Sequence, residues 1–110
     1  MRIDLPTPPT VNHAYAVVRG RKILSKAGRD YKADVATRLL LARWRPLGGE
    51  VVWSLWWRRD RKSGDISNRI KLVEDAMKGI AWADDAQVVE LHAYRSDEGE
   101  PGITVEVLPA

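Results

Sequence analysis

Acidic and basic side chains follow one another along residues 58–88 in an order that suits chemistry on a phosphate group. Asp65 and the pair Asp84–Asp85 supply carboxylates on either side of a helical segment. Carboxylate oxygens are ligands that Mg²⁺ prefers. A basic cluster that would attract a polyanion precedes Asp65; it consists of Arg58, Arg59, Arg61 and Lys62. Together these residues predict a metal-dependent enzyme that acts on a polyanion such as DNA.

The segment between the acids is expected to be a helix from about Ser67 to Lys78, with Gly79 ending it. Apolar residues recur there at spacings of three and four and would face a core; they are Ile70, Val73, Met77 and Ile80. A second, polar stripe lies opposite; it contains Asn68, Lys71, Asp75 and Lys78. A polar helix face is usually a solvated surface, so a solvent-facing stripe and a stripe lining a site both stay open. The flanking acids favour the second interpretation.

Composition limits the class of protein. With 110 residues, of which 45% are hydrophobic, the chain is expected to form one domain over residues 1–110. No apolar run reaches the roughly 20 residues of a membrane span, and the first ten residues hold no signal-peptide core. The absence of cysteine excludes disulfides and thiolate metal sites and predicts a cytoplasmic protein. The only histidines, His13 and His92, have no metal-ligand partner nearby in sequence, and no Gly-rich phosphate loop is present.

Charge is unevenly distributed along the chain. The net charge is only +3. Residues 1–62 hold fourteen Lys and Arg against five Asp and Glu, whereas residues 63–110 hold four against ten. This asymmetry indicates a basic surface for phosphates and a separate acidic pocket for cations.

Periodicity and turn signals predict the elements that must position these residues. The expected order is strand 1–5, a polar loop 10–15, hairpin 16–24, helix 25–44 with Ser25 as its N-cap, strand 50–57, helix 67–78, strand 87–94 and strand 103–107. The buried stripe of the first helix is expected at Tyr31, Val35, Leu39 and Ala42. The order predicts an α+β fold: a single two-layer domain in which a mixed β-sheet packs with two main helices.

Two features of these elements have more than one interpretation. The hairpin tip, Arg19-Gly20-Arg21-Lys22, is either a solvated turn or a loop that touches a phosphate backbone. Three tryptophans in strand 50–57 (Trp53, Trp56 and Trp57) are expected in the core or in a subunit interface rather than in a base-stacking platform. The residues do not decide between the two roles of the hairpin tip.

The chain resembles the RusA family of Holliday-junction resolvases. The resemblance rests on Asp65-Ile66-Ser67-Asn68, Lys71 and Asp75, and then on Trp82-Ala83-Asp84-Asp85-Ala86-Gln87-Val88. The opening is similar too, with prolines after the first strand, then Asn12, and later Ser25, Gly28 and Tyr31. The spacing from Asp65 to the Asp84–Asp85 pair is the specific part of the pattern, and the resemblance spans nearly the whole chain.

Members of this family are small homodimeric endonucleases, often encoded by prophages. They use Mg²⁺ or Mn²⁺ to cut paired strands near the crossover of a four-way DNA junction, in DNA recombination and repair. The resemblance implies metal-binding catalytic carboxylates at Asp65 and Asp85, with Asp84 beside them, and a catalytic lysine at Lys71. On the residues alone, the favoured role of Lys71 is an ordinary i,i+4 salt bridge to Asp75.

DNA affinity is expected to come from phosphate contacts. The residues expected to make DNA contacts are Asn12, Arg19, Arg21, Lys22, Arg58, Arg59, Arg61, Lys62, Asn68 and Arg69. A four-way junction has two-fold symmetry, so two sites in a homodimer are expected. The Trp-rich strand is a candidate for part of that dimer interface.

One position departs from the family pattern. Ser67 stands where the pattern often has a second Asp. A hydroxyl can ligate Mg²⁺ or hold a metal-bound water but adds no negative charge. Glu74 and Asp75 are candidates to compensate, and Asp75 is the better placed because it lies on the polar stripe. The alternatives are a junction-binding protein with weakened catalysis and a nuclease for other branched DNA.

Overall fold

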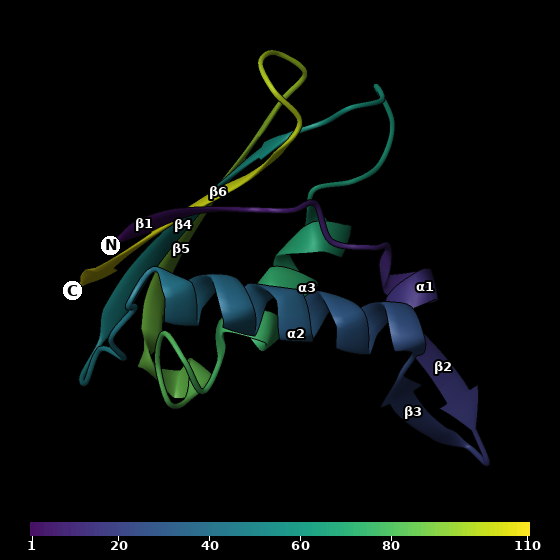
Figure 1. Ribbon diagram of the computed structural model, residues 1–110, viewed down its shortest axis with the longest axis horizontal. Helices are drawn as coiled ribbons and strands as arrows, with labels where there is room; N and C mark the ends of the chain where they lie inside the picture. The colour runs from purple at the N-terminus through teal and green to yellow at the C-terminus, as the bar shows by residue number, and fades with distance from the viewer.

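The computed structural model describes residues 1–110 and consists of a β-sheet with helices on one face (Figure 1). In chain order the elements are β1 (Arg2–Leu5), α1 (Val11–Ala14), β2 (Tyr15–Val18), β3 (Arg21–Leu24), α2 (Lys26–Leu41), β4 (Val51–Arg58), α3 (Ser67–Met77), the 3₁₀ helix η1 (Asp85–Gln87), β5 (Val88–Ser96) and β6 (Gly102–Pro109). None of the helices has the length and apolar character needed to cross a membrane.

The main sheet has the strand order β1-β6-β4-β5, and β2 and β3 form a separate hairpin. Strands β4 and β5 run parallel, while β6 pairs antiparallel with both β1 and β4. The predicted α+β class and mixed sheet are therefore confirmed. The hairpin projects from the N-terminal end of α2, away from the sheet (Figure 1).

The core lies between the sheet and the two long helices. Alternate residues of β4 are buried against the helices, including Trp53 and Trp57, as their period of two requires. Trp53 and Trp57 therefore lie in the core, which is one of the two places expected for the tryptophans of this strand. Trp56 points to the opposite face of the sheet, where it stacks on Tyr94 with ring centroids 5.8 Å apart.

Helix α2 begins as predicted, because the Ser25 side chain accepts a hydrogen bond from the Gly28 N–H at 3.2 Å. It ends at Leu41, three residues before the predicted end at Trp44. Arg43 takes a left-handed φ of 56°, which stops the helix and turns Trp44 into the core. Ala42 is consequently exposed, so its predicted place in the buried stripe is wrong.

Helix α3 covers the predicted stretch, but its buried face is wider than the predicted stripe. Leu72 and Ala76 are buried together with Val73 and Met77. Ile80 lies beyond the helix, in the turn that follows Gly79. The helix therefore packs into the core along two adjacent rows of side chains.

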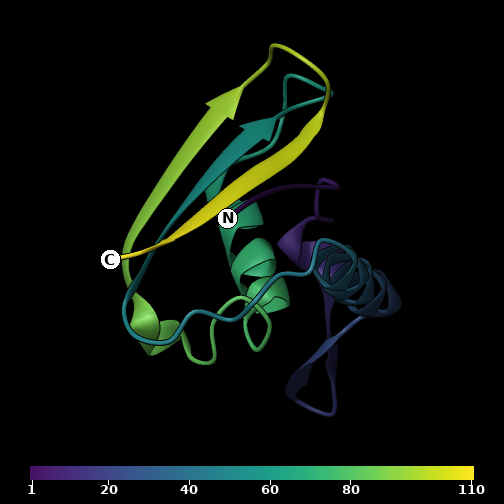
Figure 2. The ribbon, with the colours of Figure 1, turned by 60° about the vertical axis from the view of Figure 1, so that its left-hand side comes forward.

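The structure also adds detail at three places in the expected order of elements. Residues 10–15 are not all loop, because Thr10 caps the short helix α1 by accepting the His13 N–H at 3.3 Å. Asp84–Asp85 do not begin a strand; they start η1, just before β5. Strand β5 is an exposed edge of the sheet (Figure 2), where Val89 is 47% exposed.

Replacing Gly28 with Ala should destabilise the fold, although this change usually stabilises a helix interior. A Cβ at position 28 would overlap the carbonyl oxygen of Ala14 and lie 2.9 Å from Leu24 Cδ2. We expect a decrease of about 1–3 kcal/mol in the free energy of unfolding, measured by urea denaturation. Gly48→Ala is the matched control, since nothing lies within 4 Å of its added carbon. Unchanged stability in Gly28→Ala would contradict the close packing of α1 on α2.

Candidate active site

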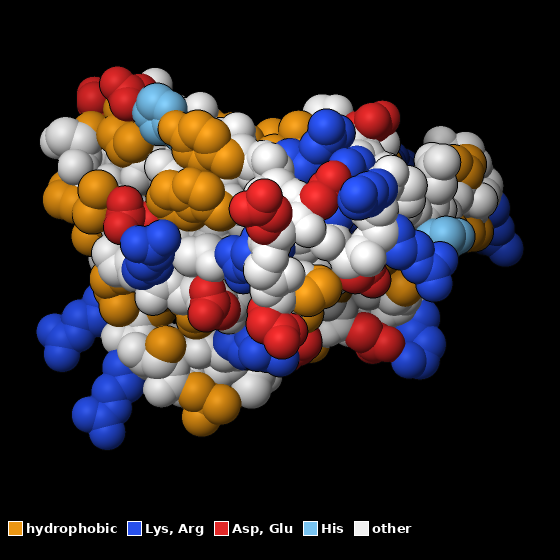
Figure 3. Space-filling view, turned by 90° about the horizontal axis from the view of Figure 1, so that it is seen from above, with side chains coloured by type: hydrophobic (Ala, Val, Ile, Leu, Met, Phe, Trp, Pro, Cys, Tyr) orange, Lys and Arg blue, Asp and Glu red, His pale blue; other side chains and the backbone are white.

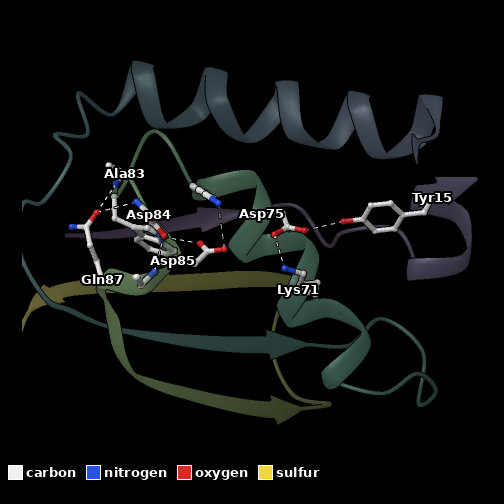
Figure 4. Close-up of polar contacts among 10 residues, drawn as sticks. Tyr15, Lys71, Asp75, Ala83, Asp84, Asp85 and Gln87 are labelled. Atoms are coloured by element: carbon white, nitrogen blue, oxygen red, sulfur yellow. Dashed lines mark hydrogen bonds and ion pairs between the residues drawn. The ribbon is translucent and has the colours of Figure 1, made fainter. Parts of the chain in front are cut away.

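The carboxylate of Asp85 is held beside α3 by a buried tryptophan (Figure 4). Trp82 Nε1–H donates to Asp85 Oδ1 at 3.2 Å, and the Lys78 ammonium lies 3.8 Å from Oδ2. The Trp82 side chain is fully buried, with its ring against that of Trp53. The hydrophobic core thus fixes the position of a carboxylate that is itself partly open to solvent.

The loop that carries Asp84 and Asp85 is fixed by Gln87. The Gln87 Oε1 accepts the N–H groups of Ala83 and Asp84 at 2.8 and 3.0 Å, and its amide nitrogen donates to the carbonyl groups of Leu47 and Gly49. The Asp84 carboxylate accepts the Ala86 N–H at 2.9 Å and caps η1. Asp84 therefore has a capping role in which its charge meets the positive end of that short helix.

On the adjacent face of α3, three side chains are connected by hydrogen bonds (Figure 4). The Lys71 ammonium donates to Asp75 Oδ1 at 3.0 Å, and the Tyr15 hydroxyl donates to Asp75 Oδ2 at 2.9 Å. The salt bridge expected from the i,i+4 spacing is present. The hydrogen bond to Asp75 raises the pKa of Lys71, and the charges of Asp75 and Asp85 raise it further. Lys71 is therefore a cation held near two carboxylates.

Glu74 is the other acid that α3 brings toward Asp85. Burial raises the pKa of the Glu74 carboxyl, and the negative charge of Asp85 raises it further. Lys71, Glu74 and Lys78 recur at spacings of three and four, so they share one face of the helix. Asp75 and Glu74 are the two candidates to supply the negative charge that Ser67 lacks. Both oxygens of Asp75 accept hydrogen bonds from protein side chains. The Glu74 carboxyl instead experiences the negative charge of Asp85.

Asp65 and Ser67 lie at the opposite end of α3 from Asp85. Both side chains are exposed. Asp65 precedes the first turn of α3, whereas Asp85 contacts Lys78, which follows the last turn. No three residues among the Asp, Glu and His side chains lie close enough together to hold a metal ion. The expected convergence of Asp65 with the Asp84–Asp85 pair is not present. The donors are all oxygens, which suits a hard divalent cation that keeps most of its waters.

The basic residues fall into two groups. Arg58 donates to the Glu100 carbonyl and to Thr104, and Arg59 binds both oxygens of Asp97 at 2.5 and 2.8 Å. Arg69 lies over the Trp57 ring and donates to the Pro8 carbonyl. These three arginines tie the loops to the sheet and to α3. The remaining basic residues expected at DNA are exposed; they are Arg19, Arg21, Lys22, Arg61 and Lys62.

Sequence reasoning assigned no role to three residues that shape this region: Trp82, Gln87 and Tyr15. The capping box formed by Asp84 and Gln87 has a sequence signal, an acid followed three residues later by Gln. Trp82 stands three residues before Asp85, a spacing that gives no reliable signal outside a helix. Tyr15 meets Asp75 across 60 residues, and no local pattern predicts that contact.

Comparison with known proteins identifies the family of this chain. Residues 6–108 match the family described as endodeoxyribonuclease RusA. The chain belongs to the RusA family. It is 35% identical over 97 residues to the crossover junction endodeoxyribonuclease RusA of Shigella sonnei, to that of Enterobacteria phage 82 and to that of Escherichia coli K12. The matched segment covers 84% of this chain and 80% of each of these relatives.

Proposed function

We propose that this chain is an endonuclease that resolves four-way DNA junctions by hydrolysing paired phosphodiester bonds. One observation carries the proposal: the core indole of Trp82 holds the Asp85 carboxylate against the α3 face that bears Lys71 and Glu74. A carboxylate that can hold a metal ion, beside a cation that can stabilise charge on the phosphate, suits the cleavage of a phosphodiester. The names of the RusA relatives, which act at crossover junctions, support the same substrate.

Asp85, with Asp84 beside it, is proposed to hold Mg²⁺ or Mn²⁺, because magnesium needs only one or two protein carboxylates and completes its shell with water and substrate phosphate. Asp65 and Ser67, which the family resemblance also implies as ligands, lie at the other end of α3 and do not converge with Asp85 in this structure. When bound, such an ion supplies an activated water and charge neutralisation at phosphorus. Lys71 is the residue proposed to stabilise the negative charge that develops on the phosphate.

DNA affinity is proposed to come from the exposed cations rather than from the arginines with protein partners. Replacing Arg61 and Lys62 together by Ala should weaken junction binding and reduce the slope of log K against log [salt] by about 0.9 for each phosphate that is no longer neutralised. Binding isotherms at several salt concentrations measure this. The matched control is Lys26→Ala with Arg38→Ala, which removes two exposed cations already paired with Asp30 and Asp34. An equal slope in both double variants would contradict the assignment.

A homodimer is proposed to form through the sheet face that no helix covers. Trp56 stacks there on Tyr94, and the Arg2 guanidinium lies 5.0 Å from the Trp56 ring centroid. Viewed from above, hydrophobic side chains come to the surface together where the sheet lies (Figure 3). Trp56→Glu is expected to shift the protein to monomers in sedimentation velocity, because it places a charge in an apolar interface.

The matched control for this variant is Leu40→Glu, which places the same charge at an apolar residue that is 71% exposed on α2. Because α2 lies on the other face of the sheet, Leu40→Glu should leave the dimer intact. A dimer that survives Trp56→Glu but dissociates in Leu40→Glu would place the interface on the helices instead.

The test of the proposed function is cleavage of a synthetic four-way junction with Mg²⁺ or Mn²⁺, with a linear duplex as control. Symmetric nicks near the crossover that require the metal would support the proposal. Tight junction binding without product would favour a binding protein in which Ser67 marks lost catalysis. Preferred cutting of forks or flaps would favour a nuclease for other branched DNA.

We also propose that the protein acts in the cytoplasm, where its DNA substrate lies.

A further inference from the structure

We propose that Tyr15 is a positioning residue that holds Lys71 in place through Asp75. The inference rests on the proposed function, in which Lys71 acts at the scissile phosphate. The Asp75 carboxylate has one oxygen on each partner: Oδ2 accepts the Tyr15 hydroxyl at 2.9 Å, and Oδ1 accepts the Lys71 ammonium at 3.0 Å. The three side chains form a continuous line from the hairpin to α3 (Figure 4).

Lys71 needs such support because its own helix restrains it weakly. Its side chain is 63% exposed, and an exposed i,i+4 pair leaves both partners free to change rotamer. Asp75 is more enclosed, at 33% exposure, and gains a second donor from outside the helix. A carboxylate fixed from two sides offers the ammonium one preferred position instead of several.

Tyr15 can act as that support because it is itself well anchored. Its backbone N–H caps α1 by donating to the Val11 carbonyl, and it pairs with Leu24 across the hairpin. The Lys22 ammonium lies 4.4 Å from the centroid of its ring. The preceding segment is tied to α3 through the bond from Arg69 to the Pro8 carbonyl. Contacts on both sides of α1 therefore fix the distance from Tyr15 to α3.

The arrangement also connects a surface for DNA with the reacting group. Lys22 belongs to the basic hairpin, and it packs on the same tyrosine that holds Asp75. A phosphate bound by Lys22 would therefore be connected through the Tyr15 ring to the hydrogen bonds that orient Lys71. This makes Tyr15 a link between DNA contact and the position of the catalytic lysine.

The first test is steady-state cleavage by Tyr15→Phe, which removes only the hydroxyl. We expect kcat to fall about 10- to 100-fold, by analogy with the range for residues that orient metal ligands, with KM and junction affinity unchanged. Tyr31→Phe is the matched control, because its hydroxyl donates to the Pro6 carbonyl at 2.9 Å and has no link to Lys71. A rise in KM with unchanged kcat would overturn the proposal.

A double-variant cycle tests whether Tyr15 acts through Asp75. Asp75→Ala and the combined Tyr15→Phe, Asp75→Ala variant should have equal kcat, because the hydroxyl has no side chain left to position once the acceptor group is removed. Effects that multiply would mean that Tyr15 acts by another route and would overturn the proposal.

A readout that does not need activity separates this inference from the proposed function. Competitive acetylation of lysines, followed by mass spectrometry, reports how firmly each ammonium is held. Tyr15→Phe should raise the labelling rate of Lys71 about 2- to 5-fold, as expected for loosening an ion pair, while Lys32 keeps its rate. An unchanged Lys71 rate would overturn the link even if the enzyme cuts junctions. A wild-type protein that cuts nothing would refute the proposed function and leave the labelling result to decide on the link.

Discussion

Replacing Asp85 by Asn is expected to abolish junction cleavage while the protein stays folded and bound to DNA. The change removes one negative charge from the proposed metal site, yet the amide oxygen can still accept the hydrogen bond that Trp82 donates at 3.2 Å. The core around Trp82 therefore remains packed. The rate should fall by at least about 10²- to 10³-fold, the effect of removing one group that stabilises the transition state.

The measurement is cleavage of a labelled four-way junction in Mg²⁺, together with a binding isotherm and a thermal melt for the same variant. Asp30→Asn is the matched control, since Asp30 is an exposed partner of Lys26 on α2. Cleavage by Asp85→Asn at the wild-type rate would show that the carboxylate assignment is wrong. Loss of binding together with cleavage would show that the variant disturbs more than the metal site.

Lys71→Met is expected to lower kcat by about 10²- to 10³-fold as well, with a small effect on KM. Methionine keeps most of the unbranched stem but removes the ammonium. A lysine is charged at neutral pH, and the raised pKa of Lys71, caused first by its hydrogen bond to Asp75, extends this charged range further toward alkaline pH. Removing the ammonium should therefore lower the rate throughout the neutral and mildly alkaline range.

Single-turnover cleavage with saturating enzyme measures this effect, because it separates the chemical step from DNA binding. Lys32→Met is the matched control, an equal change at an exposed position of α2. If Lys71→Met cut junctions as fast as the wild type, Lys71 would be only the salt-bridge partner of Asp75, which is the role its spacing alone favours.

Local patterns predicted most of the elements. The alternation of Ile103, Val105 and Val107 predicted β6, and the spacing of Val73 and Met77 predicted α3, because each pattern is set by the geometry of a single element. The Ser25 cap was equally local. The helix α1 was missed because four residues are too few to establish a period.

The arrangement of the site was harder to predict. The pairing of β4 with β5 in parallel, and of β6 between β1 and β4, depends on contacts between distant segments. The carboxylates of Asp84 and Asp85 are adjacent in sequence, yet one caps η1 and the other meets Trp82. Such differences follow from the direction of side chains in a turn, which residue spacing alone does not specify.

The place of β6 in the sheet has a consequence for how the protein reaches this structure. Arg2 is the register partner of Glu106, so the two segments that meet lie almost a full chain length apart. Contacts between such distant segments slow folding, because much chain entropy is lost before they form. The helix α3 can form early from local contacts. The edges of β1 and β4 that pair with β6 stay without hydrogen-bond partners until residues 102–109 insert between them. The completed core should therefore be the last and slowest part of the molecule to assemble.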